Sequence, residues 1–146
     1  MNPAPPSGRL AGTFRGYVRR AAERRRDVGA GLIYHIAYAE EWALARRAGE
    51  YTVSTRGVSL AEQGFIHAST AAQVAGVANA FYAGESGLVL LVIDVERLAP
   101  ALKYEPAPGG DELFPHLYGP LNPDAVVDTV TFVAGADGRF EFPVAG

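Results

Sequence analysis

The hydrophobic positions of the chain fall into short strand-like runs and two helical stretches. Residues 88–95 are apolar at nearly every position, which predicts a central strand covered on both faces. The β-rich residues 32–37 predict a first strand. Residues 39–48 predict a helix, because acidic residues open it, arginines close it and Gly49 follows where a left-handed cap is favoured.

A second helix is predicted from Thr70 to about Ala83, because Thr70 and Gln73 form a capping box ahead of an apolar stripe. The side chains expected to face the core are Val74, Val77, Ala78 and Phe81. Shorter patterns predict one helical turn from Ser59 to Gly64, strands at residues 51–54, 65–68 and 102–105, and a closing hairpin of residues 125–134 and 139–142. Together these elements predict an α+β fold with a small mixed or antiparallel sheet and two main helices.

Composition limits the class of protein. A chain of 146 residues, 49% of them hydrophobic, has the size of one domain and can bury a core. It has no cysteine, which excludes disulfides, thiolate nucleophiles and thiolate metal sites. No apolar run approaches the roughly 20 residues needed to span a bilayer. We therefore expect a soluble, cytoplasmic protein without a membrane partner, and the pattern predicts no oligomeric state.

The two ends of the chain differ in charge. Residues 1–30 carry seven arginines and two acidic residues, a net charge of +5, whereas residues 31–146 carry six basic and 14 acidic residues, a net charge of −8. We expect residues 1–30 to be a disordered or loosely helical Arg-rich extension and residues 31–146 to form one domain. Residues 1–30 fit three alternatives: an arm that binds nucleic acid or a membrane surface, a targeting peptide, or a solvated extension. The charge of the domain disfavours phosphate backbones, so nucleic-acid binding is expected only through the arm.

One histidine lies between a predicted strand and a helix start, in Gly64-Phe65-Ile66-His67-Ala68-Ser69-Thr70. Strand alternation puts Phe65, His67 and Ser69 on one face, and the helix amides that open at Thr70 are expected to point toward it. Phosphate, carboxylate or a developing oxyanion could be held there, with His67 as donor or general acid/base. In the alternative reading, Thr70 only caps the helix and Ser69 only turns the chain.

A second candidate group is the pair Lys103 and Glu105, which share one face of their predicted strand. Glu105 comes just before an exposed Pro/Gly-rich loop at residues 108–111, where a carboxylate could reach a ligand. A solvated surface pair is the alternative.

The remaining histidines lie in apolar surroundings. His116 and Tyr118 belong to an aromatic, proline-bounded segment, in which Phe114 or Tyr118 could stack on a planar ring or close the edge of a sheet. His35 lies in the first strand, where a histidine is often a hydrogen-bonded core residue.

Metal binding is another use for the three histidines, because three imidazole nitrogens can hold a catalytic zinc. His35, His67 and His116 have none of the short spacings of a ligand pair, and we assign no metal ligand. The chain also lacks a Gly-x-Ser-x-Gly elbow, a phosphate loop and a dinucleotide fingerprint.

Four motifs carry a family resemblance: Ile33-Tyr34-His35-Ile36, Gly64-Phe65-Ile66-His67-Ala68-Ser69, Leu102-Lys103-Tyr104-Glu105 and Phe114-Pro115-His116-Leu117-Tyr118-Gly119-Pro120-Leu121. With these motifs, over about residues 32–134, the chain resembles a bacterial family of small domains of unknown function. That family is distantly similar to the ADP-ribosyltransferase fold, in which an early-strand histidine, a platform residue before a helix and a later acid bind NAD. The resemblance implies that His35 touches the nicotinamide ribose, that residues 67–69 form the platform strand and that Glu105 is the acid. The platform residue is usually aromatic, and here it is His67 or Ala68.

Three functions remain open. The first is binding of NAD or another phosphorylated nucleotide, with ADP-ribosyltransferase-like transfer of a ribosyl or phosphoryl-ribose group and NAD as substrate rather than resident cofactor. Its expected catalytic residues are His67, Glu105 and His35, and its expected ligand-binding residues are Ser69, Thr70, Lys103, His116 and Tyr118. The second is a non-catalytic module for a small anionic or aromatic ligand, and the third is a His-ligated, metal-dependent hydrolase.

Overall fold

The computed structural model describes residues 31–107 and 109–143 and has the predicted α+β fold. Its first sheet has the order β1 (Leu32–Tyr38), β5 (Leu88–Asp94) and β8 (Val126–Phe132), and both pairings are antiparallel. β5 is central, as its unbroken apolar pattern predicts, and Leu90 and Leu91 on its two faces are completely buried.

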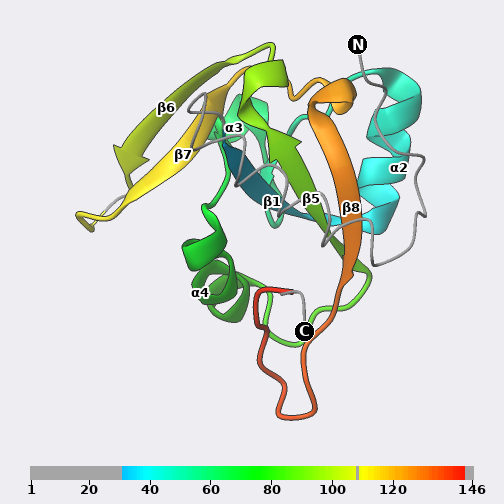
Figure 1. Cartoon of the computed structure of the whole chain (residues 1–146), viewed down its shortest axis with the longest axis vertical. Helices are drawn as coiled ribbons and strands as arrows, with labels where there is room; N and C mark the ends of the chain where they lie inside the picture. Colours follow the sequence, from blue (N-terminus) through cyan, green and yellow to red (C-terminus); the bar gives the residue numbers. More distant parts are fainter. Residues whose placement is uncertain (1–30, 108, 144–146) are drawn as a thin grey trace.

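Two helices cover the two faces of this sheet (Figure 1). α2 (Ala39–Ala48) packs Trp42 and Ala45 into one core cluster, and α4 (Ala71–Phe81) packs Val74, Val77 and Ala78 into the other. α2 ends at the left-handed Gly49, as predicted. Among the described residues, no helix is long and apolar enough to cross a membrane.

A second sheet has the order β4 (Ile66–His67), β7 (Leu113–Tyr118) and β6 (Ala101–Pro106), again antiparallel. β6 and β7 extend as a hairpin to one side of the molecule (Figure 1). The segment that follows β4 joins this sheet to the first one, because Ser69 and Tyr34 exchange two backbone hydrogen bonds of 2.8 Å. β1 and β4 are therefore neighbours, although 32 positions separate His35 from His67.

Short elements complete the described chain. Ser59 and Glu62 form the predicted capping box of α3 (Leu60–Gln63). The remaining elements are β2 (Val53–Thr55), β3 (Val58–Ser59), and the 3-10 turns η1 (Val95–Arg97) and η2 (Pro123–Ala125).

β7 is a central strand that the sequence did not predict, because Pro115 lies inside it. The Pro115 carbonyl accepts the last ladder bond from Ala68 N–H, at 2.9 Å, at the point where β4 ends. The missing N–H of Pro115 therefore falls at the end of a two-residue pairing rather than within a long one, which explains why the proline is tolerated.

Two other expectations were wrong. Residues 139–142 form no strand, because the backbone N–H of Phe140 donates to the Asn79 side chain of α4 at 2.8 Å, while the Phe140 carbonyl accepts from it at 3.1 Å. Phe81, expected to face the core, is 56% exposed because α4 ends there. Tyr82 leaves the helical path at φ −123° and takes the buried position instead.

Candidate functional site

Most of the predicted site residues converge on one face of the sheet formed by β4, β7 and β6. Residue alternation and the pairings His67 with His116 and Lys103 with His116 place them on the same side. We call this surface the imidazole face, and its residues are Phe65, His67, Lys103, Glu105, Phe114, His116 and Tyr118. The opposite face of the same sheet carries Ile66 and Leu117, which are buried in the core.

Glu105 connects the side chains of the imidazole face. Its Oε1 atom accepts hydrogen bonds from the Tyr118 hydroxyl at 2.5 Å and from His116 Nδ1 at 2.9 Å. These two bonds, the first being the stronger influence, hold the pKa of the Glu105 carboxyl below its usual range. The Tyr118 ring also lies 5.0 Å from Lys103 Nζ, within reach of a cation–π contact. Glu105 is therefore a carboxylate at neutral pH and orients two neighbours.

His116 is held on two sides. Because a carboxylate can only accept, its Nδ1 atom carries the proton of the bond to Glu105. The Phe65 ring stacks on the imidazole with centroids 3.9 Å apart and planes inclined by 15°. Nε2 is buried and has no hydrogen-bond partner among the described residues. A buried polar atom left without a partner is uncommon in native proteins. With the proton on Nδ1, Nε2 is an unused acceptor beside the imidazole face.

His67 is the imidazole of this face that reaches solvent. It is partly exposed, and its ring lies 5.0 Å from Phe114 and 5.5 Å from His116 between centroids. Burial, and then the neighbouring His116, lower the pKa of His67 to about 4. The imidazole is therefore uncharged at neutral pH, and it offers a ring face, one donor nitrogen and one acceptor nitrogen rather than a positive charge.

His35 lies behind His67, in the interior, and is 3% exposed. Its Nδ1 atom donates to the His67 carbonyl at 2.7 Å, and its Nε2 atom is 2.9 Å from the Tyr51 hydroxyl. Burial lowers the pKa of His35 to about 4, so the ring is neutral, and Nε2 accepts from the tyrosine. Both nitrogens are thus engaged within the protein, as in the core-residue alternative, and a ligand would have to displace Tyr51 to reach Nε2.

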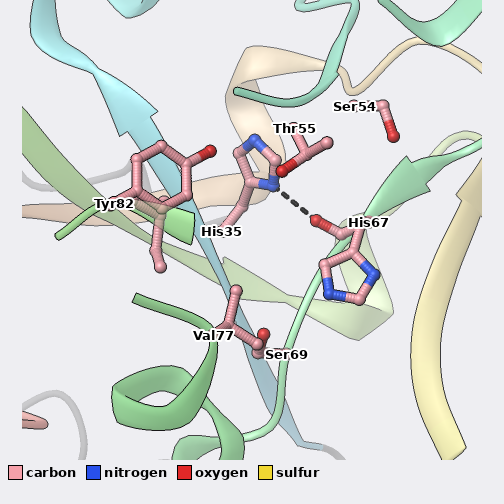
Figure 2. A pocket seen from close by; sticks show the side chains of 8 residues that line it. His35, Ser54, Thr55, His67, Ser69, Val77 and Tyr82 are labelled. Carbon is pink, nitrogen blue, oxygen red and sulfur yellow. Dashed lines mark hydrogen bonds between the residues drawn. The ribbon is translucent and has the colours of Figure 1, made fainter. Parts of the chain in front are cut away.

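A small cavity adjoins His35 and His67 (Figure 2). Ser54 and Thr55 lie on one side of the two histidines, Ser69 and Val77 on the other, and Tyr82 lies beside His35. Ser69 is buried here, beside the predicted site.

Thr70 does not share this cavity. The start of α4, with Thr70, Ala71 and Ala72, opens into a separate pocket of about 370 Å³ that also contains Tyr34 and Tyr104. Tyr104 alternates with Lys103 and Glu105 and lies on the other face of β6. The expectation that the helix amides and His67 form one anion site is therefore not met.

The geometry also gives no support to a three-histidine metal site. Within residues 31–107 and 109–143, no three His, Asp or Glu side chains gather as metal ligands. His67 and His116 are neighbours, but the hydrogen bond from His35 goes to the backbone carbonyl of His67 and not to its ring.

Two residues beside the histidines, Tyr51 and Ser54, lie in no motif that would have predicted them as site residues. Tyr51 follows a helix-ending Gly-Glu pair, and Ser54 lies in a short, weakly patterned strand. Their roles depend on long-range packing, such as the backbone bridge between Tyr51 and Leu121.

Comparison with known proteins finds relatives of the same fold. The family described as "Protein of unknown function (DUF952)" matches residues 36–129. The crystal structure of protein CC0527 from Caulobacter crescentus is similar with 35% sequence identity and a TM-score of 0.66, covering 76% of this chain and 94% of that one. A solution NMR structure of CC0527 gives 36% identity and a TM-score of 0.63, covering 74% and 90%. No curated protein matches the chain.

Proposed function

The chain belongs to the DUF952 family of proteins of unknown function, and from the geometry of its imidazole face we propose that it binds NAD or a related nucleotide there. One observation carries the proposal. Five predicted residues from three strands meet on one surface that combines aromatic rings, a neutral imidazole, a carboxylate and a lysine: His67, Lys103, Glu105, His116 and Tyr118.

Each part of a nucleotide has a chemical counterpart on this face. The partly exposed ring of His67, beside Phe114, suits stacking on a planar base or nicotinamide ring. The Glu105 carboxylate can accept hydrogen bonds from ribose hydroxyls through the oxygen not used by His116 and Tyr118. Lys103 supplies positive charge for a phosphate. The resemblance to the ADP-ribosyltransferase fold supports NAD among nucleotides.

Binding tests this proposal directly. NAD, ADP-ribose, AMP and nicotinamide are titrated into the full-length protein by calorimetry, and we expect NAD to bind. His67→Ala should weaken NAD binding by about tenfold or more, because stacking on one aromatic side chain is worth on the order of 1 to 3 kcal/mol. His67→Phe should retain most of the affinity if the ring face is what binds.

Tyr104→Ala is the matched control, because it removes an exposed ring from the opposite face of the same sheet. Its affinity should equal that of the wild type. The proposal fails if no nucleotide binds at millimolar concentration, or if His67→Ala behaves like Tyr104→Ala.

An ADP-ribosyltransferase-like activity is the finer proposal. In such a transfer, the bond between ribose C1′ and the nicotinamide nitrogen breaks, and an acceptor oxygen or nitrogen bonds C1′ while losing its proton to a base. The pairing of Glu105 with His116 favours it, since a carboxylate that fixes the tautomer of an imidazole is a common arrangement for a base. The basic atom would be His116 Nε2, which is buried, so an acceptor must displace the side chains that cover it. Glu105 then orients His116 instead of serving as a free acid.

Turnover separates this activity from a non-catalytic binding module. Release of free nicotinamide from NAD is followed by chromatography in the wild type and in Glu105→Gln. The transferase proposal expects release in the wild type and, in the variant, a loss of release that is larger than its loss of NAD binding. A binding module gives no release from either protein.

A further inference from the structure

β6 is an edge strand of the second sheet, because the strand order β4, β7, β6 leaves one of its sides unpaired. Figure 1 shows it as the outer strand of the hairpin that extends from the molecule. None of its residues is buried, and its pairing with β7 runs from Ala101 to Pro106 without a bulge. A regular, exposed edge of this kind offers its backbone N–H and C=O groups to another strand.

One hydrogen bond determines which backbone groups of β6 point outward. Ala68 N–H donates to the Pro115 carbonyl at 2.9 Å, so the backbone groups of Pro115 face β4. Tyr104, which lies opposite Pro115 on the other side, therefore belongs to a non-hydrogen-bonded pair, and its own N–H and C=O point away from β7. By alternation, the N–H and C=O of Leu102 and the carbonyl of Pro106 also point outward. Within the described part of the chain, these groups have no backbone partner outside the sheet ladder.

The edge is complementary to the same edge of a second copy. In the antiparallel register that places Tyr104 opposite Tyr104 of the second copy, the two tyrosine N–H groups donate to the two tyrosine carbonyls. Each Leu102 N–H then meets the Pro106 carbonyl of the other copy, so the missing N–H of Pro106 costs only the reverse bond.

Charge selects this register. It places each Lys103 directly opposite Glu105 of the other copy, and opposite charges in such cross-strand pairs are stabilising. The next registers that also align the outward groups differ by two residues, and they place two Lys103 or two Glu105 side chains opposite each other. Like charges in that position are destabilising.

Both charged side chains are available for the contact. Lys103 lies over the Tyr118 ring and forms no ion pair with a described residue. Glu105 uses Oε1 for Tyr118 and His116, so its other carboxylate oxygen can accept from the lysine of a second copy.

We propose that the chain forms a symmetric dimer in which β6 pairs with β6 of a second copy, antiparallel and centred on Tyr104. The contact joins the two three-stranded sheets into one, and the twofold axis passes through it perpendicular to the sheet. Both imidazole faces then lie on the same side, and each copy supplies Lys103 to the Glu105 carboxylate of the other. This inference goes beyond the proposed function and does not depend on nucleotide binding.

A disulfide tests the register, because the chain has no cysteine of its own. Hydrogen-bonded residues across an antiparallel pair have Cα atoms about 5.5 Å apart, which suits a disulfide. Tyr104→Cys should therefore form a covalent dimer under mild oxidation, detected by non-reducing electrophoresis and mass spectrometry.

Leu113→Cys is the matched control for cross-linking. Leu113 is 52% exposed and Tyr104 50%, and both lie on the same face of the hairpin. In the dimer, however, the two β7 strands are three strand spacings apart, roughly 14 Å, which is too far for a disulfide. We expect Tyr104→Cys to cross-link at least about tenfold faster, because dimerisation holds its two thiols together.

Association is measured separately by sedimentation equilibrium of the full-length chain, from micromolar to millimolar concentration. The wild type should show a monomer–dimer equilibrium. Lys103→Glu should weaken the dimer by about tenfold or more, because two attractive cross-strand pairs become repulsive. Arg139→Glu, which makes the same change of charge at an exposed position outside the sheet, should leave the equilibrium unchanged. Circular dichroism verifies that each variant is folded.

Three results would overturn the dimer: a wild type that stays monomeric at millimolar concentration, equal cross-linking of Tyr104→Cys and Leu113→Cys, or equal association of Lys103→Glu and Arg139→Glu. The nucleotide proposal is judged independently. A monomer that binds NAD overturns only the dimer, and a dimer that binds no nucleotide overturns only the proposed function.

Discussion

His35 shows how one buried residue makes the stability of the protein depend on pH. Its pKa is about 4 in the folded protein and 6.5 in an unfolded chain. Between these values the unfolded chain binds more protons, so the stabilisation is complete above pH 6.5 and is lost as the pH falls toward 4. His67, with a similar folded pKa, acts in the same direction.

We therefore predict that the free energy of unfolding falls by roughly 2 to 3 kcal/mol on account of His35 between pH 7.5 and 4.5. Denaturant titrations at both pH values measure it. In His35→Gln the group no longer titrates, so this fall should become smaller by that amount, even though the variant is less stable at both pH values. His67→Gln should remove less, because its ring is partly exposed. An unchanged pH dependence in His35→Gln would contradict the buried neutral imidazole.

The sequence located the chemistry of the site better than it assigned roles. Strand alternation predicted His67 and Glu105, because it is a local property that the pattern records, whereas His116 and Tyr118 were predicted from their aromatic, proline-bounded segment. The sequence did not predict that Glu105 binds His116 and Tyr118, since those contacts depend on how β6 and β7 pair. The burial of His35 likewise depends on Tyr51, a residue without a motif.

At the scale of elements, one side chain joins α4 to the second sheet. Gln73 Oε1 accepts from Thr70 N–H at 3.0 Å, while Gln73 Nε2 donates to the Leu113 carbonyl at 2.8 Å and to the Glu112 carboxylate at 3.0 Å. The capping box predicted from sequence is thus also a link from the helix start to the beginning of β7.

Gln73→Ala should therefore destabilise the protein by about 1 kcal/mol, through loss of one capping bond and one link to β7. Chemical denaturation measures the change, and Gln63→Ala at the end of α3, an exposed site, should stay within about 0.5 kcal/mol of the wild type. Gln73→Glu, made together with Glu112→Gln so that two carboxylates do not face each other, separates the two roles, because its carboxylate can still accept from Thr70 N–H but cannot donate to Leu113. If this double variant is as stable as the wild type, the link to β7 contributes nothing.

The elements that sequence patterns missed are those that tertiary contacts decide. Pro115 kept the sequence from predicting β7, because a proline lacks the backbone N–H that a central strand needs. The number of ladder hydrogen bonds lost depends on where the neighbouring strand ends, which the sequence does not show. Residues 139–142 alternate like a strand, yet Asn79 of α4 takes the backbone groups of Phe140. The long apolar or amphipathic patterns of β5, α2 and α4 were predicted correctly, because burial of a whole face outweighs local competition.

At the scale of the whole molecule, two separate pockets lie where the sequence predicted one anion site. His67 faces the imidazole face and the small cavity, whereas the start of α4 opens into the pocket with Tyr34 and Tyr104. His67 and Thr70, although three positions apart in the sequence, therefore line different pockets. The nucleotide proposal consequently depends on the rings, Glu105 and Lys103, and no longer on the helix amides.

The chain has a basic N-terminal segment and an acidic remainder. Residues 1–30, which lie outside the described part of the structure, carry a net charge of +5, and residues 31–146 carry −8. The family match begins at residue 36 and the first strand at Leu32. The Gly31 carbonyl accepts a hydrogen bond from Val95 N–H at 3.1 Å. A chain beginning at residue 29 retains all of these contacts.

We predict that this shortened chain melts within about 2 °C of the full chain, since a loss of 1 kcal/mol would shift a domain of this size by several degrees. Its NAD binding should be unchanged. Any binding of the full chain to duplex DNA should disappear, because phosphate contacts would come from the arginines of the arm, and that binding should weaken steeply with added salt. A full-length variant with the seven arginines replaced by glutamine should behave like the shortened chain. DNA binding that survives in either protein would place it on the acidic domain and contradict the division.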